Sequence, residues 1–479
     1  MKAIGVKNGQ IVAHYLTYGM TPPLFGSLLG VPLGKLFVGS VVMKVKQTTL
    51  TMPEWALQTS YGTTLAIVSI VLICALATLW AANGTLKATP AETMRGIDKR
   101  TKERKAKTGR AKPSGNYVIK WVWRDIGRNK LRYLIGVVGV MGSMMLMIAG
   151  FGMFDSINSS NDYVFTKQYS YDYMGQISVY TPRLKAAVDD AAGADRIQWL
   201  KQNSADLEYV NGDGETSAVI SIIEDGPYYC FENDADGRAI ALPDEGLVLT
   251  AKIARQIGAK TGDRLRFSVT GIAGSFEAEV KYIAAVRTPQ GIYLSDKAWE
   301  KLGEEFMPAT AVMDTEAYES LKETDYFSEL TSKRVQEDNI HELSDSANTV
   351  IKLLVIASFL LSVVILYNLG IMNYEERYRE YATMKVIGYT KAETTKIVLT
   401  DCMFTTIPGW LIGIPAGFGF LKLFIHVVSF DSYEWRMSML PWHFILVSVF
   451  VMACAVLVHL VICRKVNRIV MTEALKSVD

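Results

Sequence analysis

A run of mixed charges between residues 373 and 390 carries the side chains of this chain that are best suited to recognise another molecule. Acidic and basic groups are interspersed there, and a glycine follows that can end a helix. Such an element can dock into a groove on a partner protein, where charges at the rim of the contact set its register. A solvated helix that only connects two membrane spans would have the same composition. We assign eight residues to this candidate docking segment: Glu375, Glu376, Arg377, Arg379, Glu380, Met384, Lys385 and Gly388.

The other reactive side chains lack the spacing that catalysis requires. Residues 30–35, Gly-Val-Pro-Leu-Gly-Lys, are one residue short of a phosphate-binding loop and have no Ser or Thr after the lysine. No nucleophile elbow or zinc-protease signature occurs. The histidines are scattered without metal-ligand spacing, at His14, His341, His426, His443 and His459. We therefore expect no enzymatic activity, no metal and no cofactor.

Ionisable groups near the bilayer midplane would indicate ion-driven transport. The apolar segments of this chain contain few of them, namely Asp401 near the inner end of one segment and Lys35 and Lys422 near outer ends. Long lysine side chains at such positions reach the interface. The pattern disfavours a secondary transporter, which remains the least favoured alternative.

Half of the residues are hydrophobic, and the charges are divided unevenly. Residues 155–345 carry 34 acidic and 18 basic side chains, a net charge of −16, so the remainder must carry +18 to give the total of +2. An acidic polar part and a basic apolar part are typical of a membrane protein. Crossing a bilayer takes roughly 20 apolar residues. Six segments meet this requirement, near 15–40, 61–83, 131–154, 348–371, 397–427 and 441–463.

Positive charge sets the expected orientation of the chain. Residues 84–132 hold 15 Lys or Arg and 4 acidic side chains, so the positive-inside rule places them in the cytoplasm. Six crossings then put both termini in the cytoplasm and residues 155–347 outside it. Lys44 and Lys46, in a loop expected outside, oppose this weakly.

We therefore expect a polytopic α-helical membrane protein with about six transmembrane helices and an α+β extracytoplasmic domain. Its expected parts are a partial two-helix unit at 1–95, a basic cytoplasmic linker with an interfacial helix at 96–130, a transmembrane helix at 131–154, an extracytoplasmic domain with a stalk at 155–347, and a three-helix unit at 348–479.

Local sequence patterns predict the helices and strands of several of these parts. Residues 117–128 have the spacing of an amphipathic helix on the membrane surface, although a helical extension of the next span would explain the spacing equally well. In the outer domain, alternation predicts strands at 177–180, 218–223, 246–249, 265–269 and 276–280, and helical spacing predicts a helix at 251–257. Residues 315–347 have helical spacing and are expected to continue into the fourth span as a stalk.

The chain also contains an internal repeat. Residues 1–6 match residues 384–389 at an offset of 383, and the offset carries Gly26, Gly30, Pro32 and Gly34 onto Gly409, Gly413, Pro415 and Gly417. Glu92, Met94 and Arg95 align with Glu473, Leu475 and Lys476 at an offset of 381. Such self-similarity indicates duplicated structural units.

Four stretches of the sequence resemble the FtsX/MacB-type permeases of ABC transporters. Residues 376–390, Glu-Arg-Tyr-Arg-Glu-Tyr-Ala-Thr-Met-Lys-Val-Ile-Gly-Tyr-Thr, resemble that family's coupling helix, which meets the ATPase subunit. Residues 124–132 are similar to the start of the family's first span, and residues 247–263 to its extracytoplasmic domain. Residues 90–95 resemble the motif that follows the family's last span.

The resemblance implies a unit of one span, an outer domain and three further spans. Residues 117–479 fit one such unit, and residues 1–95 fit the last two spans of an earlier one. The chain is then expected to be the C-terminal part of a tandem two-unit permease, whether truncated, misannotated at its start or encoded by a split gene.

The resemblance also implies a function. It predicts the permease subunit of an ABC transporter in a bacterial cytoplasmic membrane, which couples ATP hydrolysis by a separate cytoplasmic ATPase to export or other extracytoplasmic work by mechanotransmission. Expected partners are that ATPase, membrane lipids, a second permease chain or the missing N-terminal half, and an unknown extracytoplasmic substrate or protein, but no nucleic acid. The alternative is a membrane sensor or regulator of the same fold that controls a cell-wall hydrolase or a kinase.

Overall fold

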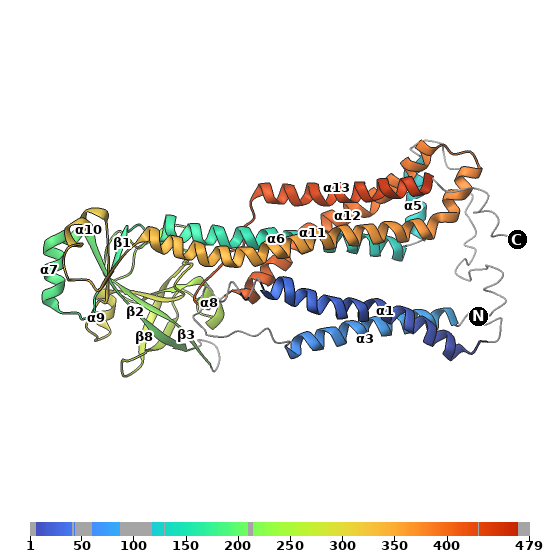
Figure 1. The fold of residues 1–479 in the computed structure, drawn as a ribbon. Coiled ribbons are helices and arrows are strands. Elements are labelled where there is room, and N and C mark those ends of the chain that lie inside the picture. The colour runs from blue at the N-terminus through green and yellow to red at the C-terminus, as the bar shows by residue number, and fades with distance from the viewer. Residues whose placement is uncertain are drawn as a thin grey trace. The chain divides into compact units, whose positions relative to one another are not determined.

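The computed structural model describes residues 6–40, 43, 60–86, 117–128, 130–208, 214–429 and 431–467. The chain forms two compact units, residues 1–117 and 118–479, which we describe separately (Figure 1). Most of the predicted basic linker, the loop that carries Lys44 and Lys46, and the repeat positions at 92–95 and 473–476 lie outside the described residues.

The first unit consists of two helices that pack against each other. Helix α1 spans Asn8–Gly34 and continues as a π-helical turn, η2, over Lys35–Gly39, and α3 spans Tyr61–Leu86. Gly19 allows the close approach, because a Cβ atom there would lie 2.3 Å from Oγ1 of Thr78.

Four long helices form the membrane part of the second unit. They are α6 (Lys130–Tyr163, continued by the π-helical η3 over Val164–Gln168), α11 (Lys333–Val386), α12 (Lys391–Val428) and α13 (Pro441–Asn467). Helix α6 packs against the other three. Helix α12 remains helical through Pro408 and Pro415.

Five helical segments among the described residues are long and apolar enough to cross a membrane: Tyr61–Ala82, Lys130–Gln168, Asn348–Tyr378, Lys391–Val427 and Pro441–Val466. They coincide with five of the six predicted spans. The segment predicted near 15–40 is helical but is not among the five. Three prolines and five glycines lower the mean hydropathy of α1, and the α-helix ends at Gly34.

Helix α11 corrects two expectations. The mixed charges at 373–390 were expected to form a short helix between two spans, but α11 is a single helix of 54 residues, and the candidate docking segment lies at its end. The predicted stalk is continuous only from Lys333 onward, because residues 315–332 form helix α10 (Thr315–Leu321) and strand β11 (Glu329–Ser332). Helix α5 (Tyr117–Arg128) lies across the ends of α11 and α12, and is not an extension of α6 (Figure 1).

An α+β domain caps one end of these helices (Figure 1). Its strands are β1 (Tyr173–Gln176), β2 (Ile197–Glu208), β3 (Glu215–Ile223), β4 (Phe231–Glu232), β5 (Ala239–Ile240), β6 (Leu247–Thr250), β7 (Arg264–Val269), β8 (Phe276–Ala284), β9 (Gly291–Ser295), β10 (Thr310–Met313) and β11. Its remaining helices are α7 (Pro182–Ala192), the 3-10 turn η4 (Ala194–Arg196), α8 (Ala251–Ile257) and α9 (Asp296–Lys301).

The main sheet closes on itself through its longest strand. Nine strands follow the order β11-β1-β10-β2-β3-β9-β6-β8-β7, and β7 pairs again with β2. Six strands therefore form a closed barrel, and β10, β1 and β11 extend from the first half of β2. The predicted strand pair at 265–269 and 276–280 is confirmed as β7 and β8. The strand predicted at 177–180 is wrong, because β1 ends at Gln176.

The connection between α12 and α13 lies against the α+β domain. Arg436 forms an ion pair with Asp234, and Glu434 forms one with Arg255. The backbone N–H of Glu434 donates to the carbonyl of Arg287 at 2.8 Å. The same connection is bound to α6, where Oδ2 of Asp155 accepts a hydrogen bond of 2.9 Å from the N–H of Leu440, and where further bonds come from the Arg436 and Ser438 N–H groups.

Candidate coupling site at the end of the long helices

Four helices meet at the end of the bundle that lies farthest from the α+β domain, which we call the distal end (Figure 1). They are α5, the start of α6, the end of α11 and the start of α12. Helix α11 ends at Val386, and Gly388 in the turn that follows has a φ of +102°, in a region that favours glycine. Helix α12 begins two residues later with a capping box, in which Thr390 and Glu393 bind each other's backbone N–H groups.

A buried arginine ties these helices together. The Arg377 side chain on α11 is only 1% exposed. Its guanidinium forms ion pairs with Asp125 of α5 and, at 2.9 Å, with Asp401 of α12. It donates a hydrogen bond of 3.2 Å to the hydroxyl of Tyr133 on α6, and it lies 4.8 Å from the ring centre of Trp121 on α5. One side chain therefore contacts all three neighbouring helices.

Arg132 completes the charge balance of this cluster. It forms an ion pair with Asp125, and the Tyr133 hydroxyl donates to the same carboxylate at 3.1 Å and also bonds to Asp401. Two arginines thus face two aspartates. A buried ion pair is tolerated when each charge is matched and hydrogen-bonded, and removing one partner leaves an uncompensated charge. We call Asp125, Arg132, Tyr133, Arg377 and Asp401 the ionic cluster.

The predicted docking residues divide into buried and exposed groups. Arg377 is buried in the ionic cluster, so its side chain does not lie on the docking surface expected from the sequence. Glu375 and Glu376 are exposed, with Glu376 3.9 Å from Arg132. Arg379 is on the same helix, and its side chain lies outside the described residues.

The rest of the docking segment continues toward the turn. Glu380 is half-buried, 4.0 Å from Nε of Arg377. Met384 packs against the apolar core of the bundle. Lys385 is half-buried, and both its partial burial and the neighbouring Lys391 lower the pKa of its ammonium group. Gly388 ends the segment.

A pocket opens between α5 and the end of α11. It has a volume of about 350 Å³ and contains both aromatic and charged groups. Ile387, which lines it, is 72% exposed. The pocket is lined by Trp121, Arg124, Asp125, Glu380, Thr383, Met384 and Ile387. A hollow with both apolar and charged walls can receive a protein side chain.

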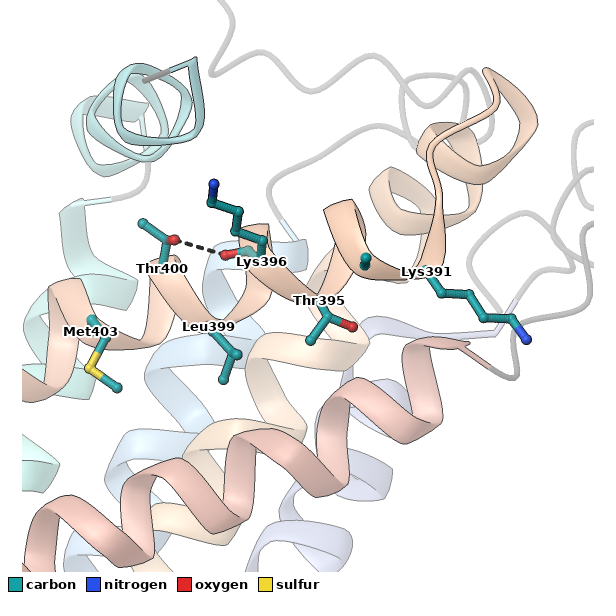
Figure 2. Close-up of a pocket in the computed structure, with 7 residues that line it drawn as sticks. Lys391, Thr395, Lys396, Leu399, Thr400 and Met403 are labelled. Carbon is teal, nitrogen blue, oxygen red and sulfur yellow. Dashed lines mark hydrogen bonds between the residues drawn. The ribbon is translucent and has the colours of Figure 1, made fainter. Parts of the chain in front are cut away.

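A second hollow lies along the start of α12 (Figure 2). Lys391 and Lys396 extend in different directions there, and Leu399 and Met403 lie along the helix. The Thr400 hydroxyl donates to the carbonyl of Lys396 at 2.8 Å. Its polar groups do not converge, so this surface has no arrangement for binding a small polar ligand. Among the described residues, no group of three or more His, Cys, Asp or Glu could hold a metal ion.

Sequence reasoning missed most of the ionic cluster. Asp401 was interpreted as an interfacial residue, and Asp125 and Arg132 only as parts of a family-like stretch. One signal was present: a buried arginine requires carboxylate partners, and Asp401 is the acidic residue within the fifth predicted span.

Comparison with protein families gives one match, which covers part of this site. Residues 1–90 and 352–471 match the model of the FtsX-like permease C-terminal family. Both segments belong to the FtsX-like permease family. One family matching at both ends agrees with the internal repeat, and the second FtsX-like segment contains the docking residues. No curated protein matches the chain.

The FtsX-like match and the five apolar helices together identify a multi-pass membrane protein of the ABC-transporter permease type. The FtsX-like family implies a non-enzymatic membrane subunit that associates with a cytoplasmic ATPase.

Proposed function

We propose that this FtsX-like permease couples ATP hydrolysis by a separate cytoplasmic ATPase to movement of its α+β domain outside the cytoplasm, by mechanotransmission. The observation that carries this proposal is the continuity of α11. The helix starts directly after strand β11 and ends at the docking segment, 54 residues later. At 1.5 Å per residue this is about 80 Å of unbroken helix.

Helix α6 provides a second connection of the same kind. It begins with Arg132 and Tyr133 in the ionic cluster and leads through η3 to the sheet of the α+β domain. The connection between α12 and α13 adds a third contact, through Glu434 and Arg436. Helices α6, α11 and α12 all contribute Arg377 or its partners at the distal end. A displacement there would therefore be shared among these three helices.

The exposed part of the distal end is the proposed ATPase surface. Glu375 and Glu376 are exposed on α11, and the exposed Ile387 lines the pocket between α5 and α11. Charges at the rim of such a contact set its register and rate of association, and a side chain that fills the pocket supplies affinity. Arg377 is assigned a positioning role, since it fixes α5 and α12 to α11.

Copurification tests the docking surface. The double variant Glu375→Lys and Glu376→Lys should lose the ATPase from detergent-solubilised complexes, because it reverses two exposed charges of the proposed surface. The matched control is Glu342→Lys, an exposed glutamate on the same helix near the α+β domain. Unchanged recovery of the ATPase with the double variant would refute this docking surface.

A second measurement separates docking from transmission. Arg377→Met should retain some ATPase binding, because its side chain is buried, while ATP hydrolysis no longer changes the environment of a fluorescent probe on the α+β domain. If ATP changes the probe signal equally in the Arg377→Met and unaltered proteins, the positioning role of Arg377 is wrong.

A further inference from the structure

The connection between α12 and α13 carries a glutamate that lies near two arginines of the α+β domain. The Glu434 side chain is only 9% exposed. One of its carboxylate oxygens, Oε1, forms the ion pair with Arg255 of α8. The other oxygen, Oε2, is buried and has no hydrogen-bond partner among the described residues. The carboxylate therefore has an unused acceptor inside the protein, where most polar atoms are hydrogen-bonded.

Arg287, which follows strand β8, is the second arginine. It is buried, and its Nε atom has no hydrogen-bond partner among the described residues. The guanidinium lies 4.3 Å from the ring centre of Tyr163 on α6, in a cation–π contact, and Nη1 donates to the carbonyl of Ala285 at 3.3 Å. Because an arginine keeps its charge in proteins, a buried guanidinium is stabilised by a carboxylate that pairs with it.

The backbone brings these two unused groups close together. The N–H of Glu434 donates to the carbonyl of Arg287 at 2.8 Å, so the two side chains start from neighbouring positions. Burial lowers the pKa of the Arg287 guanidinium, and the nearby Glu434 carboxylate opposes this lowering. Arg255 is 60% exposed and lies 3.8 Å from Asp234. Transfer of Glu434 from Arg255 to Arg287 would therefore leave neither arginine without a carboxylate or water.

We propose that Glu434 is a two-position latch, which pairs with Arg255 in this structure and with Arg287 in a second arrangement of the connection. Both arginines belong to the α+β domain, whereas Glu434 follows α12. The exchange lets the connection shift from α8 toward Tyr163 of α6 without detaching from the domain. Contacts with two discrete arrangements turn a small displacement into a switch. That movement of α12 drives the exchange rests on the proposed function, but the exchange itself does not.

Hydrogen exchange of the detergent-solubilised permease, measured without an ATPase, tests the latch. The readout is the Glu434 amide, which its bond to the Arg287 carbonyl protects. Arg255→Gln should change the exchange rate by less than about threefold, because Glu434 moves to Arg287, and Arg287→Gln should do the same, because the pair with Arg255 remains. The double variant has neither cation and should exchange about tenfold faster.

Matched variants separate the latch from a general loss of charge. Arg264→Gln combined with Arg287→Gln removes an exposed arginine of β7 in place of Arg255, and should behave like Arg287→Gln alone. Arg255→Gln combined with Arg287→Lys should behave like Arg255→Gln, because a cation remains at 287. Slow exchange of the buried β6 amides checks that the barrel is folded in each variant.

Glu434→Gln keeps the test decisive even if Arg287→Gln does not fold. It weakens both pairs, and should exchange about tenfold faster than Arg255→Gln. Exchange in Arg255→Gln that is as fast as in Glu434→Gln or in the double variant would overturn the latch. A double variant that exchanges as slowly as each single variant would overturn it as well. None of these results depends on ATPase docking, so failure of the latch and failure of the proposed function are distinguishable.

Discussion

Replacing Arg377 by methionine tests the ionic cluster most directly. The side chain is 1% exposed and pairs with Asp125 and Asp401. Without it, Arg132 is the one cation of the cluster that faces two buried carboxylates. Breaking a buried ion pair in this way destabilises proteins by roughly 3–5 kcal/mol, so Arg377→Met should lower the free energy of unfolding by about that amount.

A second substitution should reverse most of this loss. In the double variant Arg377→Met and Asp401→Asn, Arg132 and Asp125 remain as one matched pair, and no carboxylate is left without a cation. The two changes should therefore be non-additive, with an interaction energy of about 2–3 kcal/mol. Denaturant unfolding of the detergent-solubilised protein, followed by tryptophan fluorescence, measures the free energy of unfolding of Arg377→Met, of Asp401→Asn and of the double variant.

The control for this series is Glu376→Gln. Glu376 is exposed and 3.9 Å from Arg132, so this weak surface pair should contribute less than about 1 kcal/mol. The reasoning fails if Arg377→Met lowers the free energy of unfolding by less than about 1 kcal/mol. It also fails if the double variant lowers it by the sum of the two single changes.

Three further substitutions test other parts of the structure by thermal unfolding or limited proteolysis. Gly413→Leu should destabilise the second unit by about 1–3 kcal/mol, because a Cβ atom there would lie 2.7 Å from Met144, and Gly30→Leu should not. Gly388→Ala should lower the free energy of unfolding by about 1–3 kcal/mol, because the φ of this residue is +102°. It should also speed proteolytic cleavage between α11 and α12, whereas Gly9→Ala should change neither property. Glu434→Gln removes the ion pair with Arg255 and should lower the free energy of unfolding by roughly 1–2 kcal/mol. It should also expose the 431–440 connection to protease, whereas Asp236→Asn, in an exposed turn, should change neither property.

The sequence was informative where one physical signal dominated. Long apolar runs located the spans at 61–83, 131–154, 348–371, 397–427 and 441–463, since no polar helix can occupy a bilayer. Alternation located β7 and β8 because one face of each strand is buried. The sixth predicted span, at 15–40, is helical in α1 but is not among the five helices that are apolar enough to cross a membrane.

The site was less predictable, because its key contacts join residues far apart in the chain. Arg377 meets Asp125 and Asp401 from separate helices, and no local pattern distinguishes a buried arginine from an exposed one within the same charged run. The closed barrel was also hidden, since β2 pairs with β10 along its first half and with β7 along its second. Strand length alone does not reveal such sharing.

The way α6 and α11 enter the sheet limits how they can move. Strands β1 and β11 pair antiparallel with Tyr173 opposite Ser332, and the N–H of Lys333 donates to the carbonyl of Asp172 at 2.7 Å. Sliding one helix past the other at this point would require the two strands to shift by two residues, roughly 7 Å, to keep the same faces buried. Near the α+β domain the two helices therefore behave as a single rigid lever. Any scissoring between them must pivot at the sheet and be largest at the distal end.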